Sequence, residues 1–235
     1  MELTEVTIPG DDSRGDHASP AVAVLPGGAR HGMVVIHEIF GRQPEIDRVV
    51  LRFAEAGYAA VAPDLFFEGR LPCLRAVMQS MRAAEDTAPV RQAQRTRTWL
   101  CSQAGIDASK VGLIGFCFGG MFALAAGRGW GAVSSNYGAV PATEAMRGIG
   151  PVVACFGGRD RSMRGKDAEL RARLAPLGAK PEIHVYPNAG HSFLTDGHHP
   201  VMRALSWPMM HLGFHEPSAK DAWPKILDFF DRNLC

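Results

Sequence analysis

The sequence lacks the features that mark membrane, secreted or nucleic-acid-binding proteins. Its 235 residues carry a net charge of +1 and no block of Lys and Arg, so there is no electrostatic case for binding nucleic acid or an anionic membrane. No apolar run approaches the roughly 18 residues that a transmembrane helix needs. The opening MELTEVTIPG has neither the basic nor the apolar region of a signal peptide, so we expect a cytoplasmic protein.

Cysteine is scarce and has no pairing pattern. The chain has five cysteines, an odd number, and no CxxC motif, which excludes zinc ribbons and thioredoxin-type redox motifs. We therefore expect reduced thiols and no disulfide framework. The cysteines are Cys73, Cys101, Cys117, Cys155 and Cys235.

Histidines gather in one region with a spacing that could hold a metal. His211 and His215 are four apart, and His198 and His199 lie nearby. No HExxH motif or acidic third ligand accompanies them, and Pro208 and Pro217 suggest a loop. We therefore predict no metal site and no cofactor.

What the chain does have is a regular alternation of short apolar runs and helical patterns from residue 32 onward. This alternation predicts an α/β protein whose mostly parallel sheet carries helices on both faces, with an antiparallel hairpin at its start. Eight strands are expected, over residues 3–9, 21–26, 32–38, 58–64, 110–114, 132–138, 151–160 and 181–191. Helices are expected over 44–57, 86–104, 121–126, 166–178 and 218–234.

Two stretches depart from the alternation, residues 65–85 and 192–217. We expect both to be irregular and to emerge at the carboxyl ends of the strands, where open α/β sheets bind ligands. They are predicted to form pocket walls or a lid within a single domain spanning 1–235.

Cys117 lies in the segment "GFCFGG", where a predicted strand turns into a helix. G-x-C-x-G at such a junction is the nucleophile-elbow pattern G-x-S-x-G with sulfur in place of oxygen. The sharp turn leaves no room for side chains at Gly115 and Gly119, and the following helix N-terminus favours a thiolate. Cys117 is therefore a candidate nucleophile, with a buried structural cysteine as the alternative.

A nucleophile of this kind needs a base, and the base needs an orienting group. Asp160 ends the segment "FGGRD" after the seventh strand, and His191 lies in "PNAGHSF" after the eighth. The order nucleophile, acid, histidine is that of α/β hydrolases. Both residues are thus expected at the same edge of the sheet as Cys117.

Five segments together resemble the dienelactone hydrolase (carboxymethylenebutenolidase) family, and the similarity runs from about residue 20 to the C-terminal helix. They are "HEIFG" (37–41), "PDLF" (63–66), "GFCFGG" (115–120), "GGRD" (157–160) and "AGHSF" (189–193). The resemblance implies an α/β-hydrolase fold and a triad of Cys117 as nucleophile, His191 as base and Asp160 as its orienting carboxylate.

The resemblance also implies that Glu38 takes part in forming the thiolate when substrate arrives. Since Glu38 ends the third predicted strand, it should face the same crevice as Cys117. In this fold, one oxyanion N–H comes from the loop after that strand and another from the residue after the nucleophile. We expect these to be the backbone N–H groups of Ile39 and Phe118.

The substrate-binding residues are less well specified by the pattern. The family holds a substrate carboxylate with arginines, one shortly after the catalytic histidine, whereas Thr195 and Asp196 stand there in this chain. Arg82 is our candidate among the arginines of 65–85. Trp207, with Met209 and Met210, suggests a more apolar substrate site.

The sequence thus predicts a hydrolase of small-molecule esters or lactones that works through an acyl-thioester. A broader carboxylesterase or thioesterase on the same scaffold is an alternative, as are a redox-sensing thiol and a ligand-binding protein without turnover. The sequence leaves open whether the protein is a monomer or a small homo-oligomer.

Overall fold

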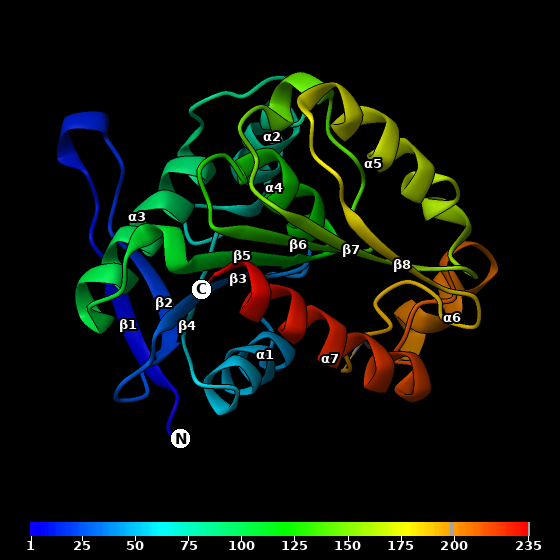
Figure 1. Cartoon of the computed structure of the whole chain (residues 1–235), viewed down its shortest axis with the longest axis horizontal. Helices are drawn as coiled ribbons and strands as arrows, with labels where there is room; N and C mark the ends of the chain where they lie inside the picture. The colour runs from blue at the N-terminus through cyan, green and yellow to red at the C-terminus, as the bar shows by residue number, and fades with distance from the viewer. Residues whose placement is uncertain (198–199, 235) are drawn as a thin grey trace.

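A computed structural model describes residues 1–197 and 200–234 of the chain, and its strands form one twisted sheet (Figure 1). Within these residues eight strands pair in the order β1-β2-β4-β3-β5-β6-β7-β8. Their bounds are β1 Thr4–Ile8, β2 Ser19–Val24, β3 His31–Ile36, β4 Tyr58–Pro63, β5 Val111–Phe116, β6 Ala132–Asn136, β7 Val152–Gly157 and β8 Glu182–Tyr186.

The sheet is mostly parallel, as the alternation predicts. β1 pairs with β2 and β2 with β4 in antiparallel fashion, and every other neighbouring pair is parallel. The expected opening hairpin is therefore confirmed. Because the remaining strands run the same way, their carboxyl ends, and the loops that follow them, meet at one edge.

Helices cover both faces of the sheet, as expected (Figure 1). In Figure 1, α2, α3, α4 and α5 lie above the sheet and α1 and α7 below it, while α6 lies beyond the ends of β7 and β8. No helix in the described part of the chain is both long and apolar enough to cross a membrane. The helices are α1 Pro44–Glu55, α2 Arg70–Ser80, α3 Ala88–Ala104, α4 Phe118–Ala126, α5 Lys166–Leu174, α6 Pro200–Met210 and α7 Glu216–Asn233, with short 3₁₀ turns η1 Asp12–Arg14, η2 Ala108–Lys110, η3 Thr143–Met146, η4 Arg161–Met163 and η5 Ala175–Leu177.

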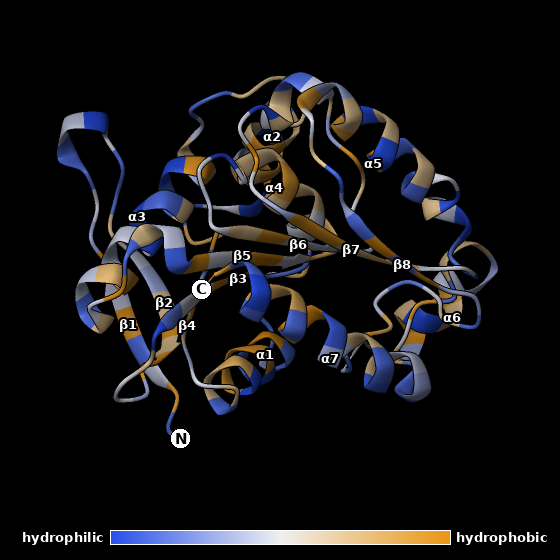
Figure 2. Cartoon of the chain, viewed as in Figure 1, coloured by the Kyte–Doolittle hydropathy of each residue, from blue (hydrophilic) through white to orange (hydrophobic). Residues whose placement is uncertain are grey.

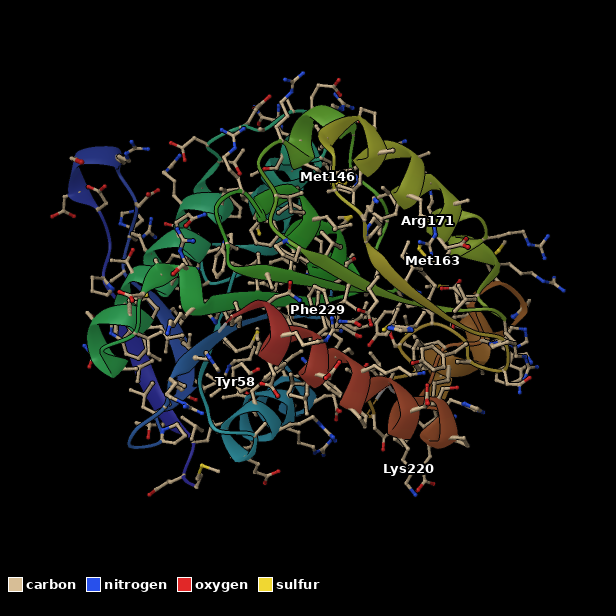
Figure 3. All side chains as sticks on the ribbon, viewed as in Figure 1. Tyr58, Met146, Met163, Arg171, Lys220 and Phe229 are labelled. Carbon is tan, nitrogen blue, oxygen red and sulfur yellow. The ribbon has the colours of Figure 1, made fainter. Side chains whose placement is uncertain are left out.

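The core consists of two apolar layers, one on each face of the sheet. Successive strand residues point to opposite faces, so alternate positions of β3 and β5 contribute to different layers. In α1 the predicted apolar face is buried, and Pro44 starts the helix as expected. Figure 2 shows the apolar strands between the helices, and Figure 3 shows Met146 of one layer above the sheet and Phe229 of the other below it.

The expectation that residues 65–85 and 192–217 are irregular is wrong, because α2 and α6 occupy much of them. Pro72 lies in the first turn of α2, where a proline is tolerated, and Pro208 lies in the last turn of α6. α2 has a weak apolar periodicity, whereas the apolar side chains of α6 are mostly exposed and none of its residues is buried. Each helix also contains a proline, and both were missed in the sequence.

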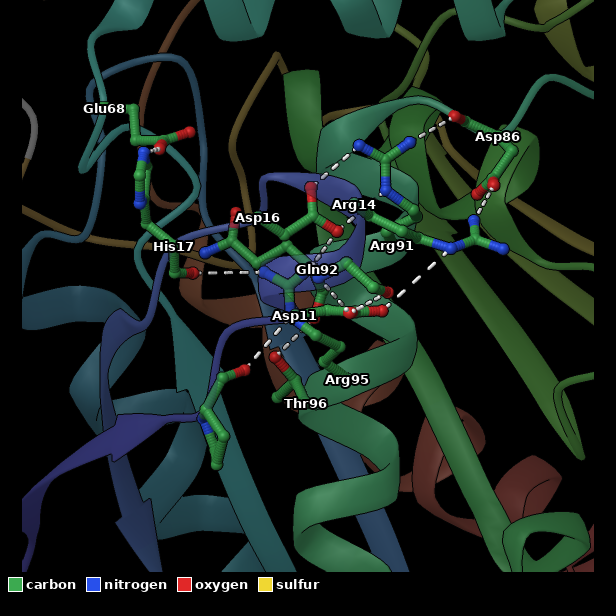
Figure 4. Close-up of polar contacts among 12 residues, drawn as sticks. Asp11, Arg14, Asp16, His17, Glu68, Asp86, Arg91, Gln92, Arg95 and Thr96 are labelled. Carbon is green, nitrogen blue, oxygen red and sulfur yellow. Dashed lines mark hydrogen bonds and ion pairs between the residues drawn. The ribbon is translucent and has the colours of Figure 1, made fainter.

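A buried carboxylate fastens the loop between β1 and β2 to α3 (Figure 4). Arg91 donates to both carboxylate oxygens of Asp16 at 2.8 Å, and Arg95 donates to one of them at 2.5 Å. The hydrogen bond from Arg91 is the main reason that the pKa of Asp16 is lowered from its usual 3.8, against the opposing effect of burial. The hairpin that shields one edge of the sheet therefore depends on an ionised Asp16.

We expect Asp16→Asn to lower the free energy of unfolding by about 2 kcal/mol near pH 7, since charge-assisted hydrogen bonds are lost. The pKa of Asp16 is lower in the folded protein than in the unfolded chain. Its contribution to the free energy of unfolding is therefore present above pH 3.8 and is lost as the pH falls through the pKa of the folded state. The stability difference from wild type should therefore shrink under acid conditions. Urea unfolding at several pH values measures it, with the exposed Asp12→Asn as control. A difference that is independent of pH would contradict the assignment.

Candidate active site

Cys117 occupies a strained turn between β5 and α4. Its backbone has φ 54° and ψ −113°, a conformation that non-glycine residues seldom adopt. Two hydrogen bonds from β6 hold the turn: the Cys117 N–H donates to the Asn136 carbonyl at 2.9 Å, and the Asn136 side-chain amide donates to the Gly115 carbonyl at 3.1 Å. The structure thus places the thiol above the carboxyl edge of the sheet, at the start of a helix.

The glycines around Cys117 are required by close backbone contacts, as the sequence predicts. A Cβ atom at Gly115 would lie 2.0 Å from the Gly119 carbonyl oxygen. One at Gly119 would lie 2.5 Å from the Ile36 carbonyl oxygen, at the end of β3. Gly119 therefore lets the first turn of α4 approach the backbone that leads to Glu38.

Asp160 and His191 are hydrogen-bonded partners at the same edge. The imidazole Nδ1–H donates to Asp160 Oδ2 at 2.6 Å. The other carboxylate oxygen accepts from the Ser162 N–H at 3.0 Å and the Ser162 hydroxyl at 2.5 Å, at the start of η4. Both Asp160 and His191 are about 2% exposed, so the pair is shielded from water and fixed in one orientation.

The protonation of His191 depends on this pair. Burial alone lowers the pKa of the imidazole, but the hydrogen bond to Asp160 and the interaction with Cys117 outweigh it and raise the pKa to about 10. Nε2 is buried and has no hydrogen bond of ordinary geometry with any group in residues 1–197 or 200–234. The interaction with the Cys117 sulfur favours the imidazolium, in which Nε2 carries a proton, so this nitrogen can act as a base only after that proton has left.

The end of α6 holds the backbone of His191. The His191 N–H donates to the Met210 carbonyl at 2.8 Å, and the Gly213 N–H donates to the His191 carbonyl at 3.0 Å. A Cβ atom at Gly190 would lie 1.9 Å from the His211 carbonyl oxygen, so only glycine allows this approach. The 192–217 segment, which we expected to be a loop, thus fixes the position of His191.

The strand register places Glu38 at the same edge of the sheet as Cys117. Ile36 of β3 pairs with Gly115 of β5, and Glu38 and Cys117 each follow two residues later. The Glu38 carboxylate is buried and accepts hydrogen bonds from the Ser192 hydroxyl at 3.0 Å and the Thr195 hydroxyl at 3.1 Å. These contacts link Glu38 to the loop that carries His191.

Tyr137 completes this buried hydroxyl network. Its hydroxyl lies 3.1 Å from that of Thr195, and its ring packs against the His191 imidazole with centroids 5.1 Å apart. Burial, with the nearby Glu38 charge, raises the pKa of Tyr137 well above its usual value, so the phenol stays neutral and able to donate. With Thr195 donating to Glu38, Tyr137 is the natural donor to Thr195.

The backbone N–H groups of Ile39 and Phe118 have no hydrogen-bond acceptor among the described residues. Ile39 follows Glu38, and Phe118 is the first residue of α4. Gly119 lets the start of α4 lie against the end of β3. The unpaired N–H groups of Phe118, on α4, and Ile39, in the loop after β3, therefore lie on neighbouring segments. Such an arrangement can stabilise a negatively charged oxygen.

A cavity of about 570 Å³ opens beside Glu38. Most of its exposed lining is apolar, and α6 contributes one wall. In the part of the chain that the structure describes, it is lined by Glu38, Phe40, Gly41, Gln43, Glu45, Ile46, Thr195, Asp196, Gly197, Pro200 and Met202.

Neither predicted substrate-binding side chain is among these lining residues. Arg82 follows the end of α2, where its N–H donates to the Gln79 carbonyl at 3.0 Å. Trp207 is half-exposed on α6, stacks edge-on against His211 and lines a separate shallow depression with Arg203. His198 and His199, weighed above as metal ligands, lie outside the described residues. His215 bonds to the Ser218 hydroxyl at 2.8 Å beside the start of α7.

Several residues that shape the site carry no assigned role in the sequence analysis. Ser162 could have been found, because Asp-x-Ser after a strand is a typical capping pattern. Ser192 and Tyr137, both with positive φ, carry no local signal, and their placement depends on segments distant in sequence. His37 belongs to the "HEIFG" segment, but its contacts are tertiary.

We expect Gly115→Ala to lower the free energy of unfolding by about 3 kcal/mol, because its Cβ atom would overlap the backbone of α4. Gly27→Ala is the control, since a Cβ atom there meets no heavy atom within 4 Å and its cost should stay within about 0.5 kcal/mol. Denaturant unfolding of both variants tests this. Equal stabilities would show that the turn can relax without cost.

The pKa of His191 should fall in both Cys117→Ala and Asp160→Asn, since each change removes a group that favours the imidazolium. The fall should be larger for Asp160→Asn, which breaks the 2.6 Å hydrogen bond. Titration of the imidazole by ¹⁵N NMR measures both, with Asp12→Asn as the control. An unchanged pKa in Asp160→Asn would contradict this account.

Comparison with known proteins identifies the relatives of this chain. The model of the dienelactone hydrolase family matches residues 19–234. The chain is 31% identical to a "Putative carboxymethylenebutenolidase" of Salmonella typhimurium, over 97% of this chain and 86% of that protein. It is 28% identical to the carboxymethylenebutenolidase of Rhodococcus opacus, over 88% of this chain and 83% of that one.

A solved structure agrees with the sequence relatives. The "Putative Dienelactone Hydrolase" of Klebsiella pneumoniae superposes with a TM-score of 0.75 at 25% identity, covering 98% of each chain. The eight-stranded, mostly parallel sheet described above is thus an α/β-hydrolase fold. With the family model matching nearly the whole chain, the protein belongs to the dienelactone hydrolase family and is a hydrolase.

Proposed function

We propose that this protein hydrolyses small-molecule esters or lactones by transferring the acyl group to Cys117, with His191 as base and Asp160 as its orienting carboxylate. The observation that carries the proposal is the buried His191–Asp160 hydrogen bond of 2.6 Å beside the strained Cys117 turn. A structural cysteine needs neither this turn nor a buried, oriented histidine next to it. We also propose that residues 1–235 form a single domain, to which Cys117, His191 and Asp160 all belong.

In the first step the Cys117 thiolate attacks the substrate carbonyl carbon. The negative charge that develops on the carbonyl oxygen is held by the backbone N–H groups of Ile39 and Phe118. The carbon–oxygen bond to the leaving group then breaks, releasing an alkoxide or an enolate and leaving a thioester on Cys117. A thiolate suits good leaving groups such as the enolate of an enol-lactone, because it expels them without first protonating them.

In the second step water releases the acid. Formation of the thioester removes the sulfur charge that helps to raise the pKa of His191. The imidazolium then gives its proton to the released alkoxide or enolate, and the neutral imidazole can take a proton from water through Nε2. The resulting hydroxide attacks the thioester carbonyl, the Cys117 thiolate departs, and the proton on His191 restores the starting state.

Glu38 is proposed to assist formation of the thiolate when substrate binds. It is buried at the same edge of the sheet as Cys117, and it is proposed to accept the thiol proton when Cys117 has not already passed that proton to His191. In this structure its carboxylate is oriented by Ser192 and Thr195. To accept a proton, Glu38 must therefore either give up these hydrogen bonds to Oε1 or take the proton on Oε2.

The substrate is proposed to occupy the cavity beside Glu38, whose lining is largely apolar. Arg82 and Trp207 remain predictions as substrate contacts, since each lies outside that lining. The carboxylates Glu45 and Asp196 in the lining disfavour a substrate that carries a negative charge near them.

We expect wild type to hydrolyse a small activated ester or a cis- or trans-dienelactone, and Cys117→Ala to lose at least about 10³-fold in kcat/KM. Mass spectrometry of acid-quenched wild type should show an acyl adduct on Cys117. Cys101→Ala, at a half-buried cysteine on α3, is the matched control and should keep wild-type activity.

Three results would redirect the assignment. Turnover by Cys117→Ala would remove the sulfur from the mechanism. Inactive wild type that consumes peroxide stoichiometrically at Cys117 would favour a redox-sensing thiol. Ester turnover without dienelactone turnover would favour a broader carboxylesterase or thioesterase on the same scaffold.

A further inference from the structure

His37 is a fully buried histidine whose two ring nitrogens have fixed hydrogen-bond roles. Nδ1 lies 2.7 Å from the Glu38 carbonyl oxygen, and the Leu65 N–H donates to Nε2 at 3.0 Å. A carbonyl can only accept a hydrogen bond, so Nδ1 must carry a proton and donate it to the Glu38 carbonyl. Asp64 Oδ1 lies 3.6 Å from Nε2, and its interaction with His37 is the main reason that the pKa of Asp64 is lowered.

The Glu38 carbonyl that His37 binds belongs to the same peptide group as the Ile39 N–H. That carbonyl also accepts the Gly41 N–H at 3.1 Å, so two donors hold it from different directions. Because a trans peptide is planar, with its C=O and N–H pointing opposite ways, fixing the carbonyl also fixes where the Ile39 N–H points. Ile39 N–H has no acceptor of its own among the described residues.

The His37 ring also contacts the element that carries the second free donor. It stacks on the Phe118 ring, with centroids 6.4 Å apart and planes 19° apart, and meets the Phe66 ring edge-on at 4.6 Å. Gly119 approaches the His37 backbone so closely that a Cβ atom there would lie 2.6 Å from the His37 carbonyl oxygen. His37 thus binds the peptide that carries the Ile39 N–H, and its ring packs against the side chain of Phe118, whose N–H is the second unpaired donor.

We infer that His37 is a positioning residue for the oxyanion hole: its Nδ1–H orients the Glu38–Ile39 peptide so that the Ile39 N–H faces the carbonyl oxygen of the substrate. The inference rests on the proposed function. His37 does not touch substrate and transfers no proton. It acts by removing the freedom of a loop peptide that would otherwise turn its N–H toward water.

The experiment compares variants of His37 in two reactions of Cys117. Hydrolysis of a p-nitrophenyl ester develops an oxyanion, whereas alkylation by iodoacetamide uses the same sulfur and develops none. His37→Leu, which has no donor, should lower kcat for the ester by about 10- to 100-fold, less than the loss expected on deleting a donor outright. Its KM should change little, and its alkylation rate should stay within about 2-fold of wild type.

Two amide variants separate positioning from simple support of the fold. His37→Gln supplies both a donor and an acceptor and should keep kcat within about 5-fold of wild type. His37→Asn can place its amide donor near the Nδ1 position but is too short to reach the Leu65 N–H. His37→Asn should therefore be less thermally stable than wild type but keep most of the kcat for the ester. This variant also tests the inference if His37→Leu fails to fold.

The inference is overturned if His37→Leu retains wild-type ester turnover, or if ester turnover and alkylation fall together. It is equally overturned if His37→Asn folds and is alkylated normally but loses ester turnover as fully as His37→Leu. Failure of the proposed function looks different: wild type would be alkylated at Cys117 but would hydrolyse no ester, and both proposals would fall.

Discussion

The constraint on which the site depends is the close backbone contact at the junction of β5 and α4. Gly115 and Gly119 let the first turn of α4 lie against the end of β3, at distances no Cβ atom would allow. That contact forces Cys117 into a positive φ, and Asn136 holds it there from the next strand. Once the turn is set, the thiol and the helix N-terminus have only one placement relative to the sheet.

The groups around the turn are buried polar side chains, and each of them is held by hydrogen bonds with neighbouring residues. Asp160 is held by Ser162 and in turn orients His191, while Glu38 is held by Ser192 and Thr195. Burial makes each unpaired polar atom costly, so such a network has few alternative arrangements. Nε2 of His191 is one of several buried polar atoms without a hydrogen bond of ordinary geometry among the described residues, and the imidazole interacts with Cys117.

The sequence predicted most of the fold because the apolar runs were long enough to reveal their period. The parallel order of β3 to β8, the opening hairpin and the buried face of α1 follow from alternation and helical spacing. α2 and α6 were missed where this signal fails: each contains a proline, and α6 buries none of its residues. Yet α6 is the helix whose end holds the His191 backbone, so the missed helix makes a structurally important contact.

By itself the sequence determined which residues lie at the carboxyl edge of the sheet, because the alternation of strands and helices and the glycines around Cys117 are visible in local patterns. It also singled out the Cys117, Asp160, His191 and Glu38 set, through motifs that follow individual strands. Only the tertiary structure decided which atoms of these residues meet. The register of β3 against β5, the hydroxyls that hold Glu38 and the two contacts of His37 join segments distant in the chain. Such contacts arise from packing, which no local periodicity records.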